Sequence, residues 1–305
     1  MSSRLLIHIG YHKTATTWMQ RSLFTAAHGY TQICSHAEVD THIVRPHGLV
    51  FDPGPMRDLV EAALSRLSEN RVPVISSEIL SGNPFYGGWG SDVFAERLRQ
   101  IAPQARILVS IRSQMRMLPS VYMQYLSRGG TMTAAQFFAG TAEPGYVRFD
   151  AAHFEYDRLI GLYRALFGKD QVFVLPQESL SRDRDEMLVH LARFCGNVDF
   201  VGLTKKARRP QGTSYPEHAA PFLRRLNHLR RSTLNPNPVI NFEFGHRRLY
   251  RATGYATKTR PMVAALGRRR PVSDHVHRAF AGYFSASNRR LKGMIGPQLD
   301  LSEYE

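Results

Sequence analysis

The stretch from Leu5 to Gln20, LLIHIGYHKTATTWMQ, constrains the fold of this chain more than any other. Its apolar run ends at Gly10 and a segment that suits a helix follows, which predicts a strand, a tight turn and a helix start. The first backbone N–H groups of a helix have no partner inside the helix and favour an anion. Lys13 and three threonine hydroxyls add a positive charge and hydrogen-bond donors. The sequence therefore predicts that this turn binds a phosphate-like group.

The order of residues in the turn differs from a Walker A loop, because no glycine stands directly before Lys13. The pattern Gly-x-x-Lys-Thr-x-Thr-Thr-Trp, from Gly10 to Trp18, resembles the phosphosulfate loop of sulfotransferases that use 3′-phosphoadenosine 5′-phosphosulfate. The resemblance implies that Trp18 stacks on the adenine. It also implies a set of residues that bind the nucleotide: Lys13, Thr14, Ala15, Thr16, Thr17 and Trp18.

Ala15 stands where the sulfotransferase loop has glycine. If the backbone at Ala15 is helical, alanine costs nothing there, since it is the better helix former. If the backbone is left-handed, alanine costs about 1 to 2 kcal/mol. The sequence leaves both conformations open. A plain strand-to-helix turn of the same composition is the alternative to an anion site.

Length and composition indicate an ordinary globular protein. With 305 residues the chain is long enough for one large α/β domain or two small ones, and 43% of its residues are hydrophobic. No apolar run approaches the roughly 18 residues of a membrane-spanning helix. The first strand begins too early to leave room for a signal sequence, and Cys34 and Cys195 are too few for a disulfide framework. We therefore expect a cytoplasmic protein.

The positive charge is concentrated in the last third of the chain. Residues 201–305 hold 20 Lys and Arg against 6 Asp and Glu, a net charge of +14, whereas residues 1–200 hold 20 against 19, a net charge of +1. Such a basic region attracts nucleic acid, anionic lipid, acidic glycans and phosphorylated nucleotides alike. The charge alone does not choose among these ligands.

Apolar runs alternate with helical periodicity over the first 200 residues. The predicted strands are Leu5 to Ile9, Tyr30 to Ser35, Val72 to Ser77, Arg106 to Ile111 and Val172 to Leu175. The predicted helices are Thr16 to Ala27, Met56 to Ser68, Asp92 to Ile101, Ser113 to Ser127 and His153 to Phe167, and Asp40 to Pro55 is predicted as a surface loop. This alternation predicts an α/β fold, with a mostly parallel central sheet flanked by helices on both faces.

Beyond Asp199 only helices are predicted. Pro216 to Arg231 has helical periodicity, and its apolar residues are expected to face inward: Phe222, Leu223, Leu226 and Leu229. We interpret residues 201–305 as a basic helical extension of a single domain, 1–305, whose core spans about residues 4–200.

Three residues that could carry chemistry follow three predicted strands: Lys13, Glu78 and Arg112. Since the carboxyl ends of parallel strands meet at one edge of a sheet, we expect these residues to share one rim. The segment RSQMRMLPSVY resembles the sulfotransferase pattern of an arginine followed by Ser-x-Tyr, which implies that Arg112 and Ser120 bind the nucleotide 3′-phosphate. A lone arginine at a strand end is explained equally well by a structural ion pair.

Glu78 follows a buried strand, where a carboxylate is costly to desolvate unless it has a partner. In the glycan-sulfating and many bacterial sulfotransferases that this chain resembles, the residue after this strand is the general base, which implies that role for Glu78. The alternative is a glutamate that caps a loop or pairs with an arginine. The predicted anion-binding turn after Gly10 is here called the anion loop. His12, which lies inside it, is the second candidate for a catalytic contact.

The resemblance implies in-line transfer of a sulfuryl group from 3′-phosphoadenosine 5′-phosphosulfate to an acceptor hydroxyl or amine. The product nucleotide is 3′-phosphoadenosine 5′-phosphate, and no metal is expected. Glu78 would accept the acceptor proton. Lys13, with Thr16 and Thr17, would neutralise the charge that develops on the transferred group.

The resemblance also implies a basic, nucleotide-contacting loop late in the chain. Lys205 to Ser214, KKARRPQGTS, is the counterpart here, with Arg208 and Arg209 as phosphate contacts, although it departs from the Arg-Lys-Gly-x-x-Gly form of the cytosolic enzymes. The basic last third favours an anionic or large acceptor such as a glycan or a lipid head group. It also suits peripheral contact with a membrane. The sequence does not indicate an oligomeric state.

Two other function classes stay open at this point. An ATP-dependent kinase would use a similar loop, but the chain lacks Gly-Lys-Ser/Thr and a clear magnesium-binding aspartate at a strand end. A non-catalytic protein that binds nucleic acid or a membrane surface would use the basic last third. That region lacks the interleaved aromatic residues of single-strand binders and a groove-reading motif, so nucleic acid is not expected.

Overall fold

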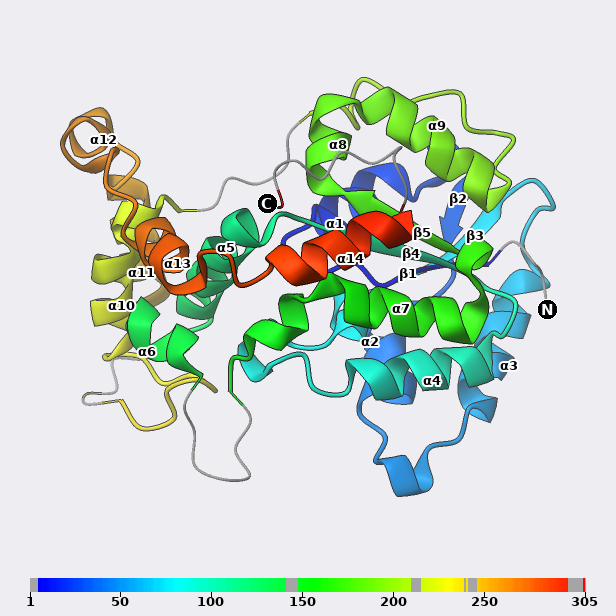
Figure 1. The fold of residues 1–305 in the computed structure, drawn as a ribbon, viewed down its shortest axis with the longest axis horizontal. Helices are drawn as coiled ribbons and strands as arrows, with labels where there is room; N and C mark the ends of the chain where they lie inside the picture. Colours follow the sequence, from blue (N-terminus) through cyan, green and yellow to red (C-terminus); the bar gives the residue numbers. More distant parts are fainter. Residues whose placement is uncertain are drawn as a thin grey trace. The chain divides into compact units, whose positions relative to one another are not determined.

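The computed structural model describes residues 5–140, 148–209, 215–238, 240, 246–295 and 304. The chain forms two compact units (Figure 1). The first, here called the sheet unit, comprises Met1–Ser113, Ala152–Gln211 and Ser285–Glu305. The second, here called the helical unit, comprises Gln114–Ala151 and Gly212–Phe284. Among the described residues, none of the helices is long and apolar enough to span a lipid bilayer.

The sheet unit is built on five parallel strands in the order β2-β3-β1-β4-β5. Their bounds are β1 Leu6–His8, β2 Tyr30–Gln32, β3 Val72–Ser76, β4 Arg106–Ile111 and β5 Val172–Pro176. The predicted α/β class and parallel sheet are confirmed. β2 is shorter than the predicted strand from Tyr30 to Ser35, because Ser35 instead caps the next helix.

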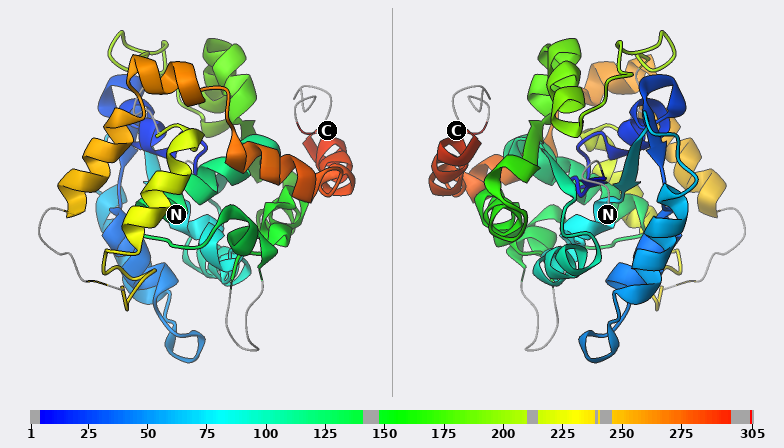
Figure 2. Two further views of the ribbon diagram at one scale, coloured as in Figure 1. Left: turned by 90° about the vertical axis from the view of Figure 1, so that its left-hand side faces the viewer. Right: turned by 90° about the vertical axis from the view of Figure 1, so that its right-hand side faces the viewer.

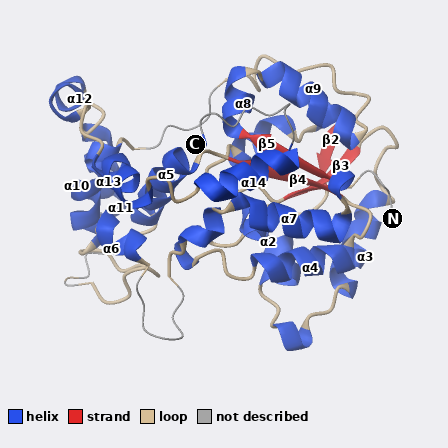
Figure 3. Ribbon diagram, in the orientation of Figure 1, coloured by secondary structure: helices blue, strands red, loops and turns tan. Residues whose placement is uncertain are grey.

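Helices flank this sheet (Figure 3). They are α1 Thr16–Trp18, α2 His36–Val39, α3 Gly54–Leu64, α4 Ser91–Ile101, α7 Tyr156–Phe167, α8 Gln177–Arg182, α9 Arg184–Cys195 and α14 Ser285–Ile295. Short 3₁₀ turns lie at Ala26–His28, Gly48–Val50, Glu78–Ser81, Pro84–Tyr86, Ala151–Phe154 and Lys169–Gln171, and π-helical turns lie at Met19–Leu23 and Asp40–Val44.

The two faces of the sheet are covered by different helices, because successive strand residues point to opposite sides. On one face, Leu6 and Leu108 lie in a buried apolar cluster with side chains of α1, α8 and α9. On the other face, α7 packs against β4 and β5, with α4 and α14 beside it. The views in Figures 1 and 2 agree that α7 and α14 lie side by side.

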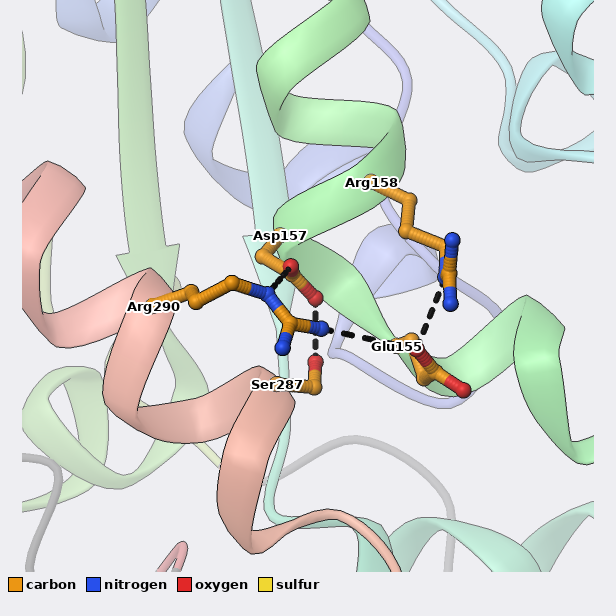
Figure 4. A network of polar contacts seen from close by, with 5 residues as sticks. All are labelled: Glu155, Asp157, Arg158, Ser287 and Arg290. Atoms are coloured by element: carbon orange, nitrogen blue, oxygen red, sulfur yellow. Dashed lines mark hydrogen bonds and ion pairs between the residues drawn. The ribbon is translucent and has the colours of Figure 1, made fainter.

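A network of charged side chains fastens α14 to α7 (Figure 4). Asp157 on α7 accepts hydrogen bonds from Arg290 Nε at 2.5 Å and from the Ser287 hydroxyl. Arg290 also pairs with Glu155 at 3.6 Å, and Glu155 accepts from Arg158 at 2.7 Å. Because the side chain of Asp157 is 6% exposed, its charge needs these partners. The network therefore holds the late helix α14 in the sheet unit.

The predicted helix from Thr16 to Ala27 is interrupted. α1 ends at Trp18, and the chain then widens into the π-helical turn Met19–Leu23, which the N–H of Phe24 closes with a 2.7 Å hydrogen bond to the Met19 carbonyl. Such turns are frequent at functional sites. The predicted helix is therefore regular α-helix only to Trp18, and it ends at Leu23 rather than at Ala27.

Part of the predicted surface loop from Asp40 to Pro55 is helical as well. Asp40–Val44 and Gly48–Val50 form a π-helical and a 3₁₀ turn. Arg97 on α4 donates hydrogen bonds to the carbonyl of Ile43 in the first turn and to that of Pro46 between the two turns. The predicted surface loop thus contains two short helical turns, and residues 47–50 are exposed as expected of a surface segment.

The helical unit contains α5 Gln114–Ser127, α6 Ala134–Ala139, α10 Ala220–Asn227, α11 His246–Ala256, α12 Arg260–Leu266 and α13 Pro271–Phe280. Aromatic rings pack against one another in its core, among them Tyr122, Tyr125, Phe137, Phe138, Phe149 and Phe280. Over its two segments the unit has 16 Lys and Arg against 5 Asp and Glu, and 16 minus 5 gives a net charge of +11.

The helix predicted from Pro216 to Arg231 buries Leu223 as expected, but it differs from the prediction at two other residues. Phe222 was expected to face inward but is 38% exposed, whereas Asn227 is fully buried. The Asn227 amide donates to the carbonyls of Leu126 and Gly130 at 2.7 and 2.8 Å, where α5 ends. A polar residue is favourable at this buried position because it satisfies carbonyls that a helix end leaves without partners.

Candidate functional site

The loop between β1 and α1 contains two non-glycine residues with left-handed backbone. The angle φ is 67° at Lys13 and 65° at Ala15. Ala15, with ψ of 21°, is the residue that precedes α1. Of the two conformations that the sequence leaves open for Ala15, the left-handed one is therefore present. Glycine would adopt it at a cost lower by about 1 to 2 kcal/mol.

This loop has the backbone geometry of an anion site. Left-handed residues within a turn bring successive backbone N–H groups to one side of the chain, where they can bind an anion. α1 begins directly afterwards, and the first N–H groups of a helix have no partner inside it. Thr16 is buried, whereas Thr17 is exposed, so the Thr17 hydroxyl is the one open to solvent.

Lys13 and Arg112 lie near each other at the carboxyl ends of the neighbouring strands β1 and β4. Burial and, second, the charge of Arg112 lower the pKa of Lys13 below its ordinary 10.5. None of the carboxylates in the described part of the chain forms an ion pair with Lys13. Because the two cations repel each other, a bound anion would stabilise both.

The backbone at Arg112 is held on both sides. Tyr156 donates from its hydroxyl to the Arg112 carbonyl at 2.7 Å. The next N–H, that of Ser113, donates to Glu178 Oε1 at 3.1 Å, and the Tyr304 hydroxyl donates to the other oxygen of Glu178 at 2.8 Å. These bonds fix the point from which the Arg112 side chain extends.

Beneath the loop lies a row of buried polar side chains. His8 Nδ1 is 2.8 Å from Ser76 Oγ, and His8 Nε2 is 3.0 Å from Ser110 Oγ. Ser110 Oγ is 2.7 Å from Thr14 Oγ1, which donates to the Tyr11 carbonyl at 2.5 Å. The Thr14 hydroxyl is thus engaged inside the protein and does not face a ligand.

Gly10 passes directly over this row. A Cβ atom at Gly10 would lie 2.0 Å from Ser110 Oγ and 2.5 Å from His8 Nε2, distances that no side chain tolerates. The loop can approach the hydrogen-bonded row this closely only because residue 10 is glycine. The glycine is therefore required by close approach and not by a left-handed backbone.

Glu78 begins the turn directly after β3, at the same edge of the sheet, and is half-buried. Gln20 donates from Nε2 to Glu78 Oε2 at 3.2 Å and to the Ser76 carbonyl at 3.3 Å. Burial acts to raise the pKa of Glu78, but its backbone hydrogen bond, His12 and Gln20 act in the opposite direction, and the pKa lies below 4.5. Glu78 is therefore ionised at neutral pH, as a general base must be.

Two histidines lie close enough to Glu78 for their charge to act on it. His12 directly precedes Lys13, and His36 opens α2, where its Nδ1 is 2.8 Å from Ser77 Oγ. The carboxyl ends of β3, β1 and β4, which are neighbours in the sheet, thus carry Glu78, the loop with His12 and Lys13, and Arg112. Within the described ranges, no three His, Cys, Asp or Glu side chains gather as they would around a metal ion.

Trp18 packs into the core of the sheet unit. Its ring is 9% exposed, its indole N–H donates to the Ala207 carbonyl at 2.8 Å, and the guanidinium of Arg184 lies 5.8 Å from the ring centroid. The stacking of Trp18 on adenine stays a prediction, and the exposed part of the ring is small.

The late basic loop is described in part, since Pro210 to Ser214 lie outside the described residues. Arg208 is paired with Asp185 through both carboxylate oxygens, at 3.0 and 3.1 Å. Arg209 is exposed. Of the two arginines predicted to contact phosphate, Arg208 therefore already has a partner.

Ser120 lies on α5, which the structure assigns to the helical unit. Its hydroxyl donates to the carbonyl of Arg116, four residues earlier, at 3.1 Å. The joint grip of Ser120 and Arg112 on a phosphate stays a prediction.

Sequence reasoning assigned no role in the site to His8, Ser110 or Gln20. The available signal was a polar residue inside each of two apolar strands, LLIHIG and RILVSI, because parallel strands place such residues side by side on one face. Gln20 lies in the π-helical turn after α1, and no pattern in the sequence distinguishes it.

The fold resembles solved sulfotransferases. A sulfotransferase from Alicyclobacillus acidocaldarius matches with a TM-score of 0.57 and 16% sequence identity, over 98% of this chain and 97% of that chain. Mouse sulfotransferase SULT7A1, complexed with PAP, matches with a TM-score of 0.39 and 13% identity, over 92% of this chain and 90% of that chain. No family model and no curated protein matches the sequence. The likeness to the Alicyclobacillus structure shows that the chain has a sulfotransferase fold.

Proposed function

We propose that this protein is a sulfotransferase that uses 3′-phosphoadenosine 5′-phosphosulfate as its sulfuryl donor. The observation that carries the proposal is the pair Lys13 and Arg112, two mutually repelling cations beside a left-handed loop at the start of α1. Such a set of donors fits a sulfate or phosphate group. The sulfotransferase fold and the Lys-Thr-x-Thr-Thr-Trp order of the loop favour the sulfated nucleotide over other anions.

In this proposal the donor nucleotide supplies an activated sulfuryl group, and the chain supplies charge and orientation. Lys13 and the backbone N–H groups of residues 14–17 hold the phosphosulfate and disperse its negative charge. Arg112 binds the 3′-phosphate, and the exposed Arg209 adds a second positive charge. The hydrogen bonds that hold the backbone at Arg112 support this role, because they fix the point from which its side chain extends.

Glu78 is proposed to accept the proton of the acceptor group. The acceptor oxygen or nitrogen forms a bond to sulfur, the bond from sulfur to the bridging phosphate oxygen breaks, and the acceptor proton passes to the Glu78 carboxylate. The departing phosphate oxygen keeps the electron pair, and Lys13 stabilises its charge. The ionised state of Glu78 at neutral pH and its position directly after β3, at the edge of the sheet where Lys13 lies, support this role. His12 is the second candidate.

A titration with three ligands tests the proposed donor. The protein is titrated with 3′-phosphoadenosine 5′-phosphate (PAP), ATP and a DNA duplex at moderate salt, and binding is followed by calorimetry. We expect PAP to bind at least about tenfold more tightly than ATP, since the 3′-phosphate adds a charged contact. Equal affinity for ATP would favour a kinase, and tightest binding of the duplex would favour a non-catalytic basic protein. Either result would overturn the proposal.

For the acceptor we propose an anionic glycan, as in the carbohydrate-sulfating branch of the family. The charge of +11 on the helical unit supports this class. The same unit has a pocket of about 380 Å³ lined by Ser127, Tyr215, Arg230, Tyr250 and Arg251. Guanidinium groups suit carboxylate and sulfate groups, and tyrosine offers an apolar ring with a polar hydroxyl.

Competing acceptors test this class. The protein and its donor are incubated with an acidic oligosaccharide, a neutral one and vesicles of anionic lipid, and mass spectrometry measures the sulfate transferred to each. We expect the acidic oligosaccharide to react fastest, and Arg230→Gln with Arg251→Gln to raise its KM without changing PAP affinity. Arg268→Gln with Arg269→Gln is the matched control, since these arginines are exposed and lie outside the pocket. Faster transfer to the vesicles would identify a lipid acceptor instead.

A further inference from the structure

A row of hydrogen bonds crosses three neighbouring strands beneath the anion loop. It links Ser76 on β3, His8 on β1 and Ser110 on β4, and it continues through Thr14 to the Tyr11 carbonyl in the loop. Each of the four side chains is buried, and the most exposed of them, Ser76, is only 5% exposed. The row therefore connects the sheet to the loop through groups that solvent does not reach.

The direction of every hydrogen bond in the row follows from its last member. A carbonyl oxygen can only accept, so the single hydroxyl proton of Thr14 goes to Tyr11. Thr14 Oγ1 must then accept from Ser110, whose own proton is thereby used, and Ser110 Oγ must accept from His8 Nε2. His8 therefore carries a proton on Nε2.

The other ring nitrogen of His8 accepts a hydrogen bond from Ser76, because the ring is neutral. Burial lowers the pKa of His8 from 6.5 to about 4, although the charge of Glu78 acts in the opposite direction. The ring of Phe24 covers His8 edge-on, with 5.5 Å between the centroids. The neutral His8 ring with its proton on Nε2 thus satisfies every hydrogen bond of the row.

We propose that His8, held in its Nε2–H tautomer, is a positioning residue that fixes the anion loop through Ser110 and Thr14. Thr14 stands between Lys13 and Ala15, the two left-handed residues. A side chain anchored at Thr14 therefore holds the backbone at the point where its N–H groups gather. This inference rests on the proposed function only where it takes the nucleotide to be the ligand that the loop binds.

Two serine variants form a matched pair that tests this role. Ser110→Ala and Ser76→Ala each remove one buried hydroxyl that contacts His8, but only Ser110→Ala cuts the connection to the loop. We expect the Kd for PAP to rise about tenfold in Ser110→Ala and less than about threefold in Ser76→Ala. Hydrogen exchange of the amides of residues 12–17 should accelerate in Ser110→Ala alone. Equal effects of the two variants in both readouts would overturn the proposal.

Two substitutions of His8 separate its donor from its bulk. The amide N–H of His8→Gln can donate to Ser110 in place of Nε2–H, whereas His8→Phe keeps a ring with no donor. We expect PAP affinity within about threefold of wild type for His8→Gln and a loss of about tenfold or more for His8→Phe. Wild-type affinity in His8→Phe would overturn the role of His8, whatever the stability of that variant.

Nitrogen NMR of the ligand-free wild-type protein reads the tautomer directly, with His8→Gln to assign the signal. At neutral pH we expect His8 to be protonated on Nε2 and unprotonated on Nδ1. A proton on Nδ1, alone or in a charged ring, would overturn the proposal. If the wild-type protein fails to bind PAP, the proposed function fails, while this spectrum and the exchange of the loop amides still test the role of His8.

Discussion

The indole N–H of Trp18 donates a 2.8 Å hydrogen bond to the carbonyl of Ala207, which lies 189 positions further along the chain. Trp18 is the last residue of α1, the short helix that directly follows the anion loop. Ala207 lies in the basic loop of residues 205–209. This single bond therefore fastens the late basic loop to the first helix of the sheet unit.

Replacing Trp18 tests that connection. Trp18→Phe keeps a large ring in the core but leaves the Ala207 carbonyl without its donor, so we expect the free energy of unfolding to fall by about 1 to 3 kcal/mol. Amides of residues 203–209 should exchange faster. Urea unfolding and hydrogen exchange measure the two effects. Trp89→Phe is the control, since Trp89 is 72% exposed. Unchanged exchange over residues 203–209 would contradict the connection.

Ala15→Gly is expected to stabilise the protein. Ala15 has φ of 65° and ψ of 21°, a conformation in which glycine is free of the Cβ clash. Glycine also has the larger entropy in the unfolded chain, which offsets part of this effect. We expect the free energy of unfolding to rise by about 1 kcal/mol, which raises Tm by about 2 °C. Calorimetry measures it, with Ala62→Gly inside α3 as a control that should lower Tm. A lower Tm for Ala15→Gly would argue against a left-handed residue 15.

Glu78→Gln should reduce the rate of sulfuryl transfer at least about 100-fold, because an amide cannot accept the acceptor proton. PAP affinity should stay unchanged. In the wild-type protein the pKa of Glu78 lies below 4.5, so the base is ionised above that pH and the rate should fall only as pH drops below 4.5. Initial rates across pH measure both, with Glu61→Gln on the exposed side of α3 as control. Full turnover by Glu78→Gln would transfer the role to His12.

His8 makes stability depend on pH. Its pKa is about 4 in the folded protein and 6.5 when unfolded, so between these values the unfolded chain binds a proton that the folded protein refuses. The free energy of unfolding should therefore fall as pH drops from 6.5 to 4, by about 3 kcal/mol from this residue. Burial also lowers the pKa of His153, to about 3, so this residue too lowers the free energy of unfolding as pH drops. Urea unfolding at several pH values should show a shallower slope for His8→Gln, and an equal slope would remove His8 as the cause.

The strands, and the placement of the predicted site residues at one edge of the sheet, could be predicted from the sequence because local pattern determines them. β4 spans Arg106–Ile111, the same residues as the predicted strand. Apolar runs alternate with segments of helical periodicity, and this alternation predicts that the strands of the sheet are parallel. Lys13 and Glu78 were expected at one edge for a simple reason, since each lies in the segment that follows a strand and parallel strands end together.

Contacts between distant residues could not be predicted. Ser110 meets Thr14 across 96 positions, and Arg97 meets Ile43 across 54. A single sequence records that such residues are polar but not which partner satisfies them. The left-handed backbone of Ala15 lay beyond reach for a related reason. Alanine favours a helix locally, whereas here it has a left-handed backbone next to Thr14, whose side chain is hydrogen-bonded to a distant strand.

The central claim, that the Lys13 loop binds the nucleotide, is tested most directly by titrating PAP into the wild-type protein and Lys13→Gly. Glycine suits the φ of 67° at this position, so the substitution removes the ammonium group without straining the loop. We predict that the Kd for PAP rises at least about tenfold while Tm is unchanged or higher. An unchanged Kd for PAP would contradict the account.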